Sequence, residues 1–283
     1  IEPISKTTGF QDLRFKNEDI DGIYSYIEAI NINKSLSAND NALLNKILSS
    51  YDKVNKGLEL NKDDFVLKGH EISEFKSINI KDYTRYLLYR YKFNKYPELK
   101  IVDDYPPCIQ IEPSSICNYR CIMCYQVDRS FSNKSSGHMG HMDLDLYKNI
   151  IDQIEGKVEA VTLASRGEPT LNKDFVKMLE YSSGKFLGFK INTNASLLSE
   201  ELSHKILSNI DIGTIVFSVD AADKVFFEKI RVNGVYEKVL KNIKNFQKIK
   251  EKYYQSSNLI TRVSGVKLNN YQDLDSMEEV WLQ

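Results

Sequence analysis

The stretch Ile116–Cys124, which reads ICNYRCIMC, contains three of the four cysteines in the chain. Thiols clustered in so short a segment indicate a metal site. The C-x3-C-x2-C spacing of Cys117, Cys121 and Cys124 supplies three thiolates from one loop, one fewer than a closed tetrahedral zinc site or an iron–sulfur cluster requires. One coordination position is therefore left for another ligand.

The composition of the 283 residues is that of an ordinary globular protein. Hydrophobic residues make up 42% and charged residues 27%, which predicts one large domain or two smaller ones. The net charge of -1 favours neither nucleic acid nor a membrane surface as the main partner. No apolar run approaches about 18 residues, so we expect no transmembrane helix. Few cysteines without a paired framework favour a reducing cytoplasm.

Residues 1–100 contain helical patterns and no strand pattern. One apolar stripe covers residues 20–30, a second helix is predicted to follow Asp40 as its N-cap, and a third begins near Asp82. Basic and aromatic side chains alternate over residues 90–96, a combination that also suits RNA. Amphipathic packing accounts for it better, because tyrosine rings shield a core while their hydroxyls stay in water.

From Pro106 onward, short apolar runs alternate with helical patterns, which is typical of βα units around a parallel sheet. The predicted strands cover residues 108–112, 158–163, 186–193, 212–219 and 259–266. The predicted helices begin at Asp143, near Phe175, at Ser199, near Ala222, at Val235 and at Tyr271. The cysteine loop follows the first strand, at the edge where parallel α/β folds place their chemistry. Residues 130–140 are predicted to form a loop with two solvated histidines.

The cysteine loop resembles the cluster loop of the radical S-adenosylmethionine (SAM) superfamily. The resemblance implies that Cys117, Cys121 and Cys124 hold a [4Fe–4S] cluster whose fourth iron binds SAM. It also implies reductive cleavage of the S–C5′ bond of SAM, followed by hydrogen abstraction from a substrate by a 5′-deoxyadenosyl radical. Members of the family often carry an aromatic residue before the third cysteine that contacts adenine. Met123 occupies that position here, and Tyr125 lies beside it.

The run Arg166 to Pro169 is similar to the family's Gly-Gly-Glu-Pro motif, with Arg166 in place of the first glycine. The resemblance implies that Gly167, Glu168 and Pro169 lie at the SAM amino group. A flexible glycine and a rigid proline around a carboxylate suit close approach to an ammonium. The alternative is an ordinary turn between a strand and a helix, but the position about 45 residues after the cysteines supports the resemblance.

Two asparagines end the third predicted strand. Asn192 and Asn194 occupy a segment similar to the strand end that lies beside the SAM ribose in the family. Asparagine side chains both donate hydrogen bonds to hydroxyls and accept them. Asparagines are equally good turn residues, which is the alternative.

The end of the fourth predicted strand, with Ser218 and Asp220, resembles a Ser-x-Asp segment of the family, and residues 226–234 resemble the Ile-Arg-x-x-Gly segment that follows it. By that resemblance Ser218 and Arg231 are candidates for the SAM carboxylate, and Asp220 faces the ribose or the substrate. In the alternative, Asp220 caps the helix that begins near Ala222, and Arg231 lies on the surface.

The predicted fold is α/β, a partial (β/α)6 TIM-like barrel of the radical SAM type with an α-helical N-terminal region. We assign residues 101–283 to the core and residues 1–100 to a helical region without an assigned role. The resemblance covers roughly residues 106–268. Five strands in place of six predict a core that lacks its C-terminal end. Relatives often continue into a SPASM or twitch domain with auxiliary clusters, for which no cysteines remain here.

The predicted function is that of a radical SAM enzyme acting on a peptide or on a sugar or amino sugar, with a flavodoxin- or ferredoxin-like electron donor. A peptide substrate would use the N-terminal helices for recognition. One alternative is a non-catalytic zinc-binding α/β module, completed by Cys108, His138 or His141. The other is an RNA-modifying radical SAM enzyme, suggested by residues 90–96 and the lysine-rich helix after Val235.

Overall fold

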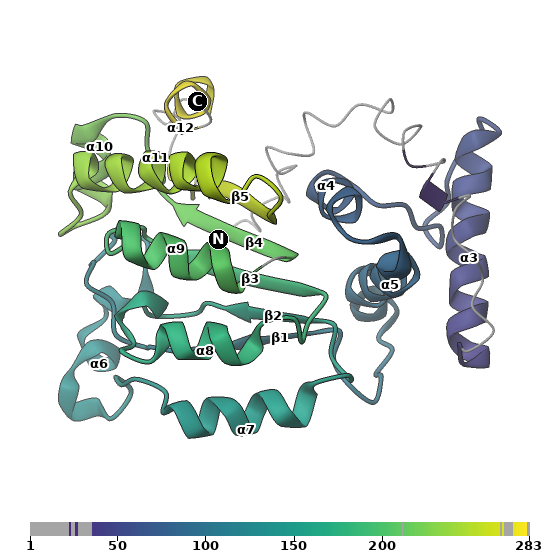
Figure 1. The fold of residues 1–283 in the computed structure, drawn as a ribbon, viewed down its shortest axis with the longest axis horizontal. Helices are drawn as coiled ribbons and strands as arrows, with labels where there is room; N and C mark the ends of the chain where they lie inside the picture. The colour runs from purple at the N-terminus through teal and green to yellow at the C-terminus, as the bar shows by residue number, and fades with distance from the viewer. Residues whose placement is uncertain are drawn as a thin grey trace. The chain divides into compact units, whose positions relative to one another are not determined.

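The computed structural model describes residues 23, 26–27, 36–210, 212–266, 268 and 274–281. The chain divides into two compact units, Ile1–Pro107 and Cys108–Gln283 (Figure 1). Most of the helix predicted over residues 20–30 lies outside the described part of the chain. Among the described residues, no helix is both long and apolar enough to cross a membrane.

The described part of the first unit is helical, as predicted. It contains α3 (Ala38–Asn55), α4 (His70–Ser77), the 3-10 turn η1 (Ile80–Asp82) and α5 (Tyr83–Leu99), and both α3 and α4 pack against α5. The predicted N-cap at Asp40 is wrong. Ser37 caps α3, because its hydroxyl accepts a hydrogen bond from the Asp40 backbone N–H at 3.0 Å. Asp40 instead lies in the first turn, where a carboxylate is favoured by the helix dipole.

The basic and aromatic stretch in α5 packs largely inside the first unit. Arg90 is 6% exposed, and its guanidinium pairs with Glu71 at 3.0 Å and lies over the ring of Tyr89. The rings of Tyr91 and Tyr96 are buried as well. This burial accounts for the mixture of bases and aromatics by amphipathic packing.

The second unit contains one parallel sheet of five strands in the order β1-β2-β3-β4-β5. The strands are β1 (Cys108–Ile111), β2 (Ala160–Leu163), β3 (Gly188–Thr193), β4 (Ile212–Ser218) and β5 (Asn258–Ser264). All five predicted strands are confirmed, although β2 and β3 each begin two residues later than predicted. Val158 already donates its backbone N–H to Ile154 at the end of the preceding helix, so it cannot join the sheet there.

Helices follow the strands along the chain: α6 (Arg129–Ser132), α7 (Leu144–Ile154), α8 (Phe175–Ser182), α9 (Glu200–Asn209), α10 (Lys224–Ile230), α11 (Tyr236–Tyr253) and α12 (Leu274–Trp281). The predicted caps Asp143 and Ser199 are confirmed. The predicted loop over 130–140 contains α6 and the 3-10 turn η3 (Lys134–Ser136). The helix expected near Ala222 begins at Lys224 and is capped by Asp223, so the alternative that Asp220 caps it is wrong.

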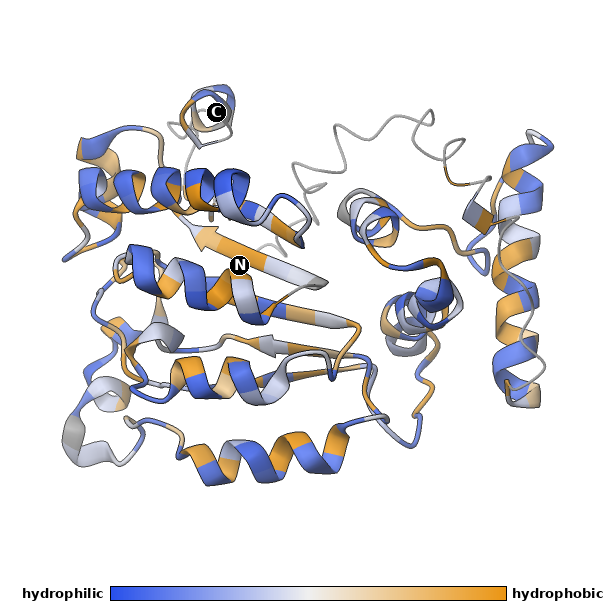
Figure 2. Cartoon of the chain, in the orientation of Figure 1, coloured by the Kyte–Doolittle hydropathy of each residue, from blue (hydrophilic) through white to orange (hydrophobic). Residues whose placement is uncertain are grey.

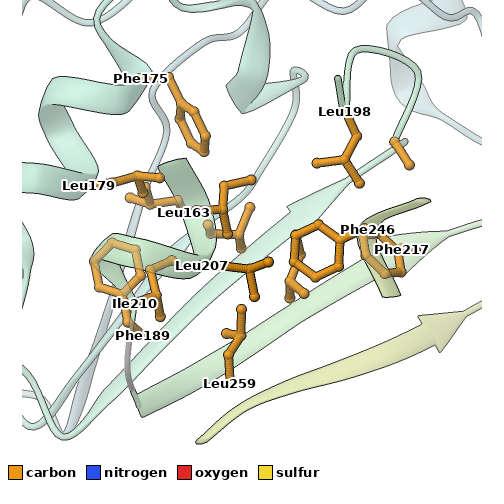
Figure 3. Close-up of a cluster of buried hydrophobic side chains, with 14 of the residues drawn as sticks. Leu163, Phe175, Leu179, Phe189, Leu198, Leu207, Ile210, Phe217, Phe246 and Leu259 are labelled. Carbon is orange, nitrogen blue, oxygen red and sulfur yellow. The ribbon is translucent and has the colours of Figure 1, made fainter. Parts of the chain in front are cut away.

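The core of the second unit lies between the sheet and helices α7 to α11. Figure 3 shows Leu163, Phe189, Phe217 and Leu259 from the strands against side chains from helices, among them Phe175, Leu179, Leu207 and Phe246. Complete burial of one such side chain contributes about 1.5–3 kcal/mol. The covering helices alternate hydrophobic and hydrophilic residues, as α7 and α11 illustrate in Figure 2.

The opposite face of the sheet is more polar, although it also carries the buried side chains of Ala160 and Val216. Side chains alternate between the two faces of a strand. Thr162, Lys190 and Thr214 therefore lie on the face opposite to the hydrophobic core. These three residues lie side by side in register across β2, β3 and β4. Polar side chains on this face are suited to contact a polar ligand near the ends of the strands.

Candidate functional site

The three predicted cysteine ligands lie close together in the loop after β1. Cys117, Cys121 and Cys124 are reduced and half-buried. A charge on Cys124 raises the pKa of Cys117, and charges on Cys117 and Cys124 raise the pKa of Cys121. Burial is the main influence: it raises the pKa of Cys117 and raises that of Cys121 to about 11.

Within the described ranges, no three His, Cys, Asp or Glu side chains are grouped as ligands of a single metal ion. A lone zinc ion holds its sulfur ligands at about 2.3 Å, whereas the thiolates of an iron–sulfur cluster are shared among several irons. His138 and His141 are exposed, and His138 stacks on Phe131. Three half-buried thiols from one loop fit the thiolate ligand set of an iron–sulfur cluster.

Backbone and side-chain donors surround the sulfur atoms. The backbone N–H groups of Tyr119 and Gln126 donate to Cys117 and Cys124 at 3.4 and 3.5 Å. Side-chain nitrogens lie at 3.9 Å from two sulfurs: Asn194 Nδ2 from Cys117 and Arg231 Nη1 from Cys121. Donors of this kind favour the thiolate form that binds metal.

Gly167 occupies a position that admits no side chain. A Cβ atom there would lie 2.0 Å from the carbonyl oxygen of Ser114 and 2.6 Å from that of Ile116. The backbone N–H of Glu168 then donates to Ile116 at 2.9 Å. The end of β2 thus packs directly against the segment leading into the cysteine loop. Pro169 is buried and begins the 3-10 turn η4 (Pro169–Leu171).

Glu168 is 2% exposed, and both oxygens of its carboxylate accept hydrogen bonds from the protein. It accepts hydrogen bonds from the hydroxyls of Thr170 and Thr193 at 2.6 and 2.7 Å, and from the backbone N–H of Asn194 at 2.7 Å. The Thr170 N–H donates as well, at 3.3 Å. Three of these bonds end on Oε1 and one on Oε2, and each carboxylate oxygen has about two acceptor positions, so Oε2 keeps room for a further donor. The contact of Glu168 with the SAM amino group stays a prediction.

The two asparagines of β3 and its end differ in their surroundings. Asn194 joins a network in which its Nδ2 donates to Asn118 Oδ1 at 2.9 Å and its Oδ1 accepts from the Ser196 N–H. Asn192 Oδ1 is buried and has no hydrogen-bond partner among the described residues. Unsatisfied buried acceptors are rare in folded proteins, and one at a strand end is the kind of group that a bound ligand satisfies.

Asp220 and Arg231 form a buried ion pair beside Cys121. Their exposed fractions are 1% and 7%, and Asp220 Oδ2 lies 2.6 Å from Arg231 Nη2. The alternative that Arg231 lies on the surface is therefore wrong. Ser218 is half-buried and pairs in register with Ser264 of β5. Contacts of Ser218, Asp220 and Arg231 with SAM stay predictions.

The two residues considered for adenine lie in different settings. Met123 is half-buried and packs against the hydrophobic core. Tyr125 is 48% exposed, and its ring meets Phe131 edge-on at 5.3 Å between centroids. Tyr125 is therefore the more accessible of the two to a ligand.

Sequence reasoning missed a cluster formed by Glu112, Gln126, Phe131 and Arg166. The guanidinium of Arg166 forms a bidentate pair with Glu112 and lies 4.9 Å from the ring centroid of Phe131. Gln126 Nε2 donates to the carbonyl oxygens of Ser115, at 2.8 Å, and Arg166. One feature of the sequence could have indicated this cluster. Arg166 replaces the first glycine of the motif, and an arginine at that position requires an acidic or aromatic side chain nearby.

Known proteins resemble the chain in sequence over the same region. Mycofactocin maturase MftC of Mycobacterium tuberculosis (strain CDC 1551 / Oshkosh) is 24% identical over 173 residues, which are 61% of this chain and 42% of the relative. Fe-coproporphyrin III synthase of Methanosarcina barkeri (strain Fusaro / DSM 804) is 26% identical over 151 residues, or 53% of this chain and 36% of the relative. The chain thus spans well under half the length of these relatives.

Solved structures and a family model extend the comparison. Streptococcus suis SuiB bound to precursor peptide SuiA matches with a TM-score of 0.51 at 17% identity, over 90% of this chain and 51% of SuiB, and it confirms the predicted fold. The model of the radical SAM superfamily matches residues 111–276. That range includes the cysteine loop and all the strand ends described above, and it covers more than half of the chain. The chain belongs to the radical SAM superfamily, whose members use a [4Fe–4S] cluster and SAM.

Proposed function

We propose that this chain is the core of a radical SAM enzyme in which Cys117, Cys121 and Cys124 hold the cluster. The observation that carries the proposal is the meeting of these three thiols with hydrogen-bond donors at the C-terminal ends of the parallel strands. When bound, the cluster supplies the electron for reductive cleavage of SAM.

The protein's own residues would bind and orient SAM. Asn192 offers the buried amide oxygen within β3 that has no hydrogen-bond partner among the described residues, and Tyr125 offers an accessible ring next to Cys124. Glu168 and the Asn194 network hold the strand ends around the thiols. Half-burial of the thiols limits access of water and oxidants, to which thiolates and their clusters are sensitive.

A peptide is the substrate class that we propose. SuiB, which shares the fold, has been solved with a precursor peptide, and MftC is named as a maturase. Residues 1–100 would recognise part of such a peptide, and a flavodoxin- or ferredoxin-like protein in a reducing cytoplasm would supply electrons. A sugar or amino sugar is the competing class. Deuterium transferred into 5′-deoxyadenosine from a deuterated peptide pool supports the peptide, and transfer from deuterated sugars alone refutes it.

The function is tested by comparing two cysteine variants after anaerobic cluster reconstitution. Cys121→Ala removes a proposed ligand. Cys108→Ala is the matched control, because Cys108 lies in β1, where its thiol is 3.8 Å from the Thr162 hydroxyl. We expect wild type and Cys108→Ala to contain four irons per chain, as a [4Fe–4S] cluster requires, and to form 5′-deoxyadenosine from SAM and dithionite. Cys121→Ala should do neither.

Two results would contradict the proposal. A colourless protein that binds one zinc ion under these conditions would identify the zinc module. Equal cluster content in both variants would remove Cys121 from the ligand set. Affinity for tRNA that falls steeply with salt concentration would favour the RNA-modifying alternative.

A further inference from the structure

The buried pair of Asp220 and Arg231 lies between the end of β4 and the cysteine loop. We propose that Arg231 is a positioning residue that raises the reduction potential of the cluster through Cys121, and that Asp220 holds its guanidinium in place and moderates its charge. The inference rests on the proposed role of Cys121 as a cluster ligand. It assigns to Arg231 a role that differs from the SAM contact predicted from the sequence.

The backbone of Arg231 is fixed at the end of α10. Its N–H donates to Phe227 at 2.8 Å, and its carbonyl oxygen accepts from the N–H of Gly234 at 2.7 Å. Gly234 has no room for a side chain, because a Cβ atom would lie 2.7 Å from that carbonyl oxygen and 3.3 Å from the ring of Tyr119. The turn after α10 therefore has one tightly packed conformation.

The same turn is attached to the cysteine loop on both sides of Arg231. The carbonyl oxygen of Ile230 accepts from the Ile122 N–H, and that of Val232 accepts from the Arg120 N–H, both at 2.9 Å. Ile122 directly follows Cys121, so the distance between the arginine and this thiol is determined by short backbone connections. Arg231 Nη1 lies 3.9 Å from Cys121 Sγ.

Asp220 is held by the neighbouring strand. Its Oδ1 accepts from the Val266 N–H at 2.7 Å, just beyond the end of β5, and its Oδ2 lies 2.6 Å from Arg231 Nη2. Its backbone is in the left-handed region, with φ of 63°. Non-glycine residues are uncommon in this conformation, although aspartate adopts it more readily than most. In this conformation the Asp220 carboxylate pairs with Nη2 of Arg231. The other terminal nitrogen of the guanidinium, Nη1, lies near Cys121 Sγ.

Charge and hydrogen bonds to the sulfur atoms set the potential of an iron–sulfur cluster. Reduction adds one negative charge, which a nearby buried cation stabilises and a nearby anion opposes. Loss of the arginine charge also removes the ion pair that Asp220 forms with Arg231. The two residues should therefore move the potential in opposite directions, with Arg231 the stronger because it contacts the sulfur.

The test is a spectroscopic redox titration of the reconstituted protein without SAM. Arg231→Gln is expected to shift the equilibrium at least tenfold toward the oxidised cluster, which is about 59 mV for one electron. Arg231→Lys should recover part of the shift, and Asp220→Asn should shift the equilibrium the other way. Lys224→Gln is the control, since Lys224 lies on α10 but pairs with Glu237 at 2.6 Å on the surface.

Each remaining outcome decides the matter. If Arg231→Gln keeps the wild-type potential but binds SAM more weakly, the arginine serves SAM and the proposal is wrong. If Arg231→Gln holds no cluster, Arg231→Lys and Asp220→Asn decide, and wild-type potentials in both overturn the proposal. Failure of the proposed function is seen separately, as an unchanged cluster in Cys121→Ala.

Discussion

The carboxylate of Glu168, just after β2, accepts a 2.7 Å hydrogen bond from the backbone N–H of Asn194, just after β3. The bond joins two neighbouring strand ends on the side of the sheet where the thiols lie. Asn194 in turn places its side-chain nitrogen 3.9 Å from Cys117 Sγ. Glu168 therefore acts on the cysteine loop by fixing the end of β3, whatever it contributes to a bound ligand.

Glu168→Gln should destabilise the protein. The amide has the same shape as the carboxylate, but its NH2 group would face a backbone donor, either the Asn194 N–H or the Thr170 N–H. A buried donor left without an acceptor costs about 1–3 kcal/mol. The free energy of unfolding in urea measures the effect. Glu180→Gln, on the exposed side of α8, should change it by less than about 0.5 kcal/mol, and an equally small change in Glu168→Gln would show that the four bonds do not form.

Gly167→Ala should disrupt the entry to the cysteine loop. The added methyl group would overlap the carbonyl oxygens of Ser114 and Ile116, so one of the two backbone segments must move. We expect less iron and sulfide after reconstitution, together with a lower unfolding temperature. Gly140→Ala is the matched control, because a Cβ atom there meets nothing within 4 Å. A Gly167→Ala protein that loads clusters as well as Gly140→Ala would contradict the prediction.

Asn192→Ala and Asn194→Ala should have separable effects. Asn192 Oδ1 has no partner in the described structure, so its loss should leave the unfolding temperature unchanged and weaken SAM binding by up to about tenfold, the value of one hydrogen bond. Asn194→Ala removes bonds to Asn118 and Ser196 and should lower both stability and cluster content. Binding measured on the reconstituted protein distinguishes them, and equal loss of stability in both variants would refute the assignment.

The sequence was informative wherever a local pattern has a local cause. The cysteine spacing, the five strands and the caps Asp143 and Ser199 depend on neighbours within a few residues. Sequence alone could not decide which of two nearby residues caps a helix. Asp220 and Asp223 both precede α10, and only Asp223 has the extended backbone, with φ of -102°, that an N-cap requires.

Contacts between distant parts of the chain were not predictable. Glu112 and Arg166 pair across 54 positions, and Arg231 reaches Cys121 across 110. The periodicity of hydrophobic residues assigns a residue to a strand or helix. It does not predict which distant loop contacts that residue in the folded protein. For the same reason the burial of Glu168 between two threonines depends on the order of β2 and β3 in the sheet.

Arg166→Ala should loosen the segment from Tyr125 to His138. Arg166 is paired with Glu112 and covers Phe131, while His138 stacks on the same ring at 5.4 Å. Removal of the guanidinium takes away its contacts with Glu112 and with the Phe131 ring. We expect faster amide hydrogen exchange in this segment. Global stability should change little, since the ion pair of Arg166 with Glu112 is partly exposed. Unchanged exchange there would mean that α6 and η3 hold the segment without Arg166.

Tyr147→Phe should remove part of the alkaline loss of stability. Burial raises the pKa of Tyr147 to about 12, and its hydroxyl lies 2.7 Å from that of Ser182. Below pH 10 both folded and unfolded states keep the proton. Between about pH 10 and 12 only the unfolded state loses it, so stability falls as pH rises, by about 3 kcal/mol for this residue. Urea denaturation at pH 9 and 11.5 should show a smaller decline in Tyr147→Phe than in wild type, whereas Tyr253→Phe, at an exposed position of α11, should decline like wild type. An identical decline in all three proteins would mean that Tyr147 ionises as readily in the folded state as in the unfolded one.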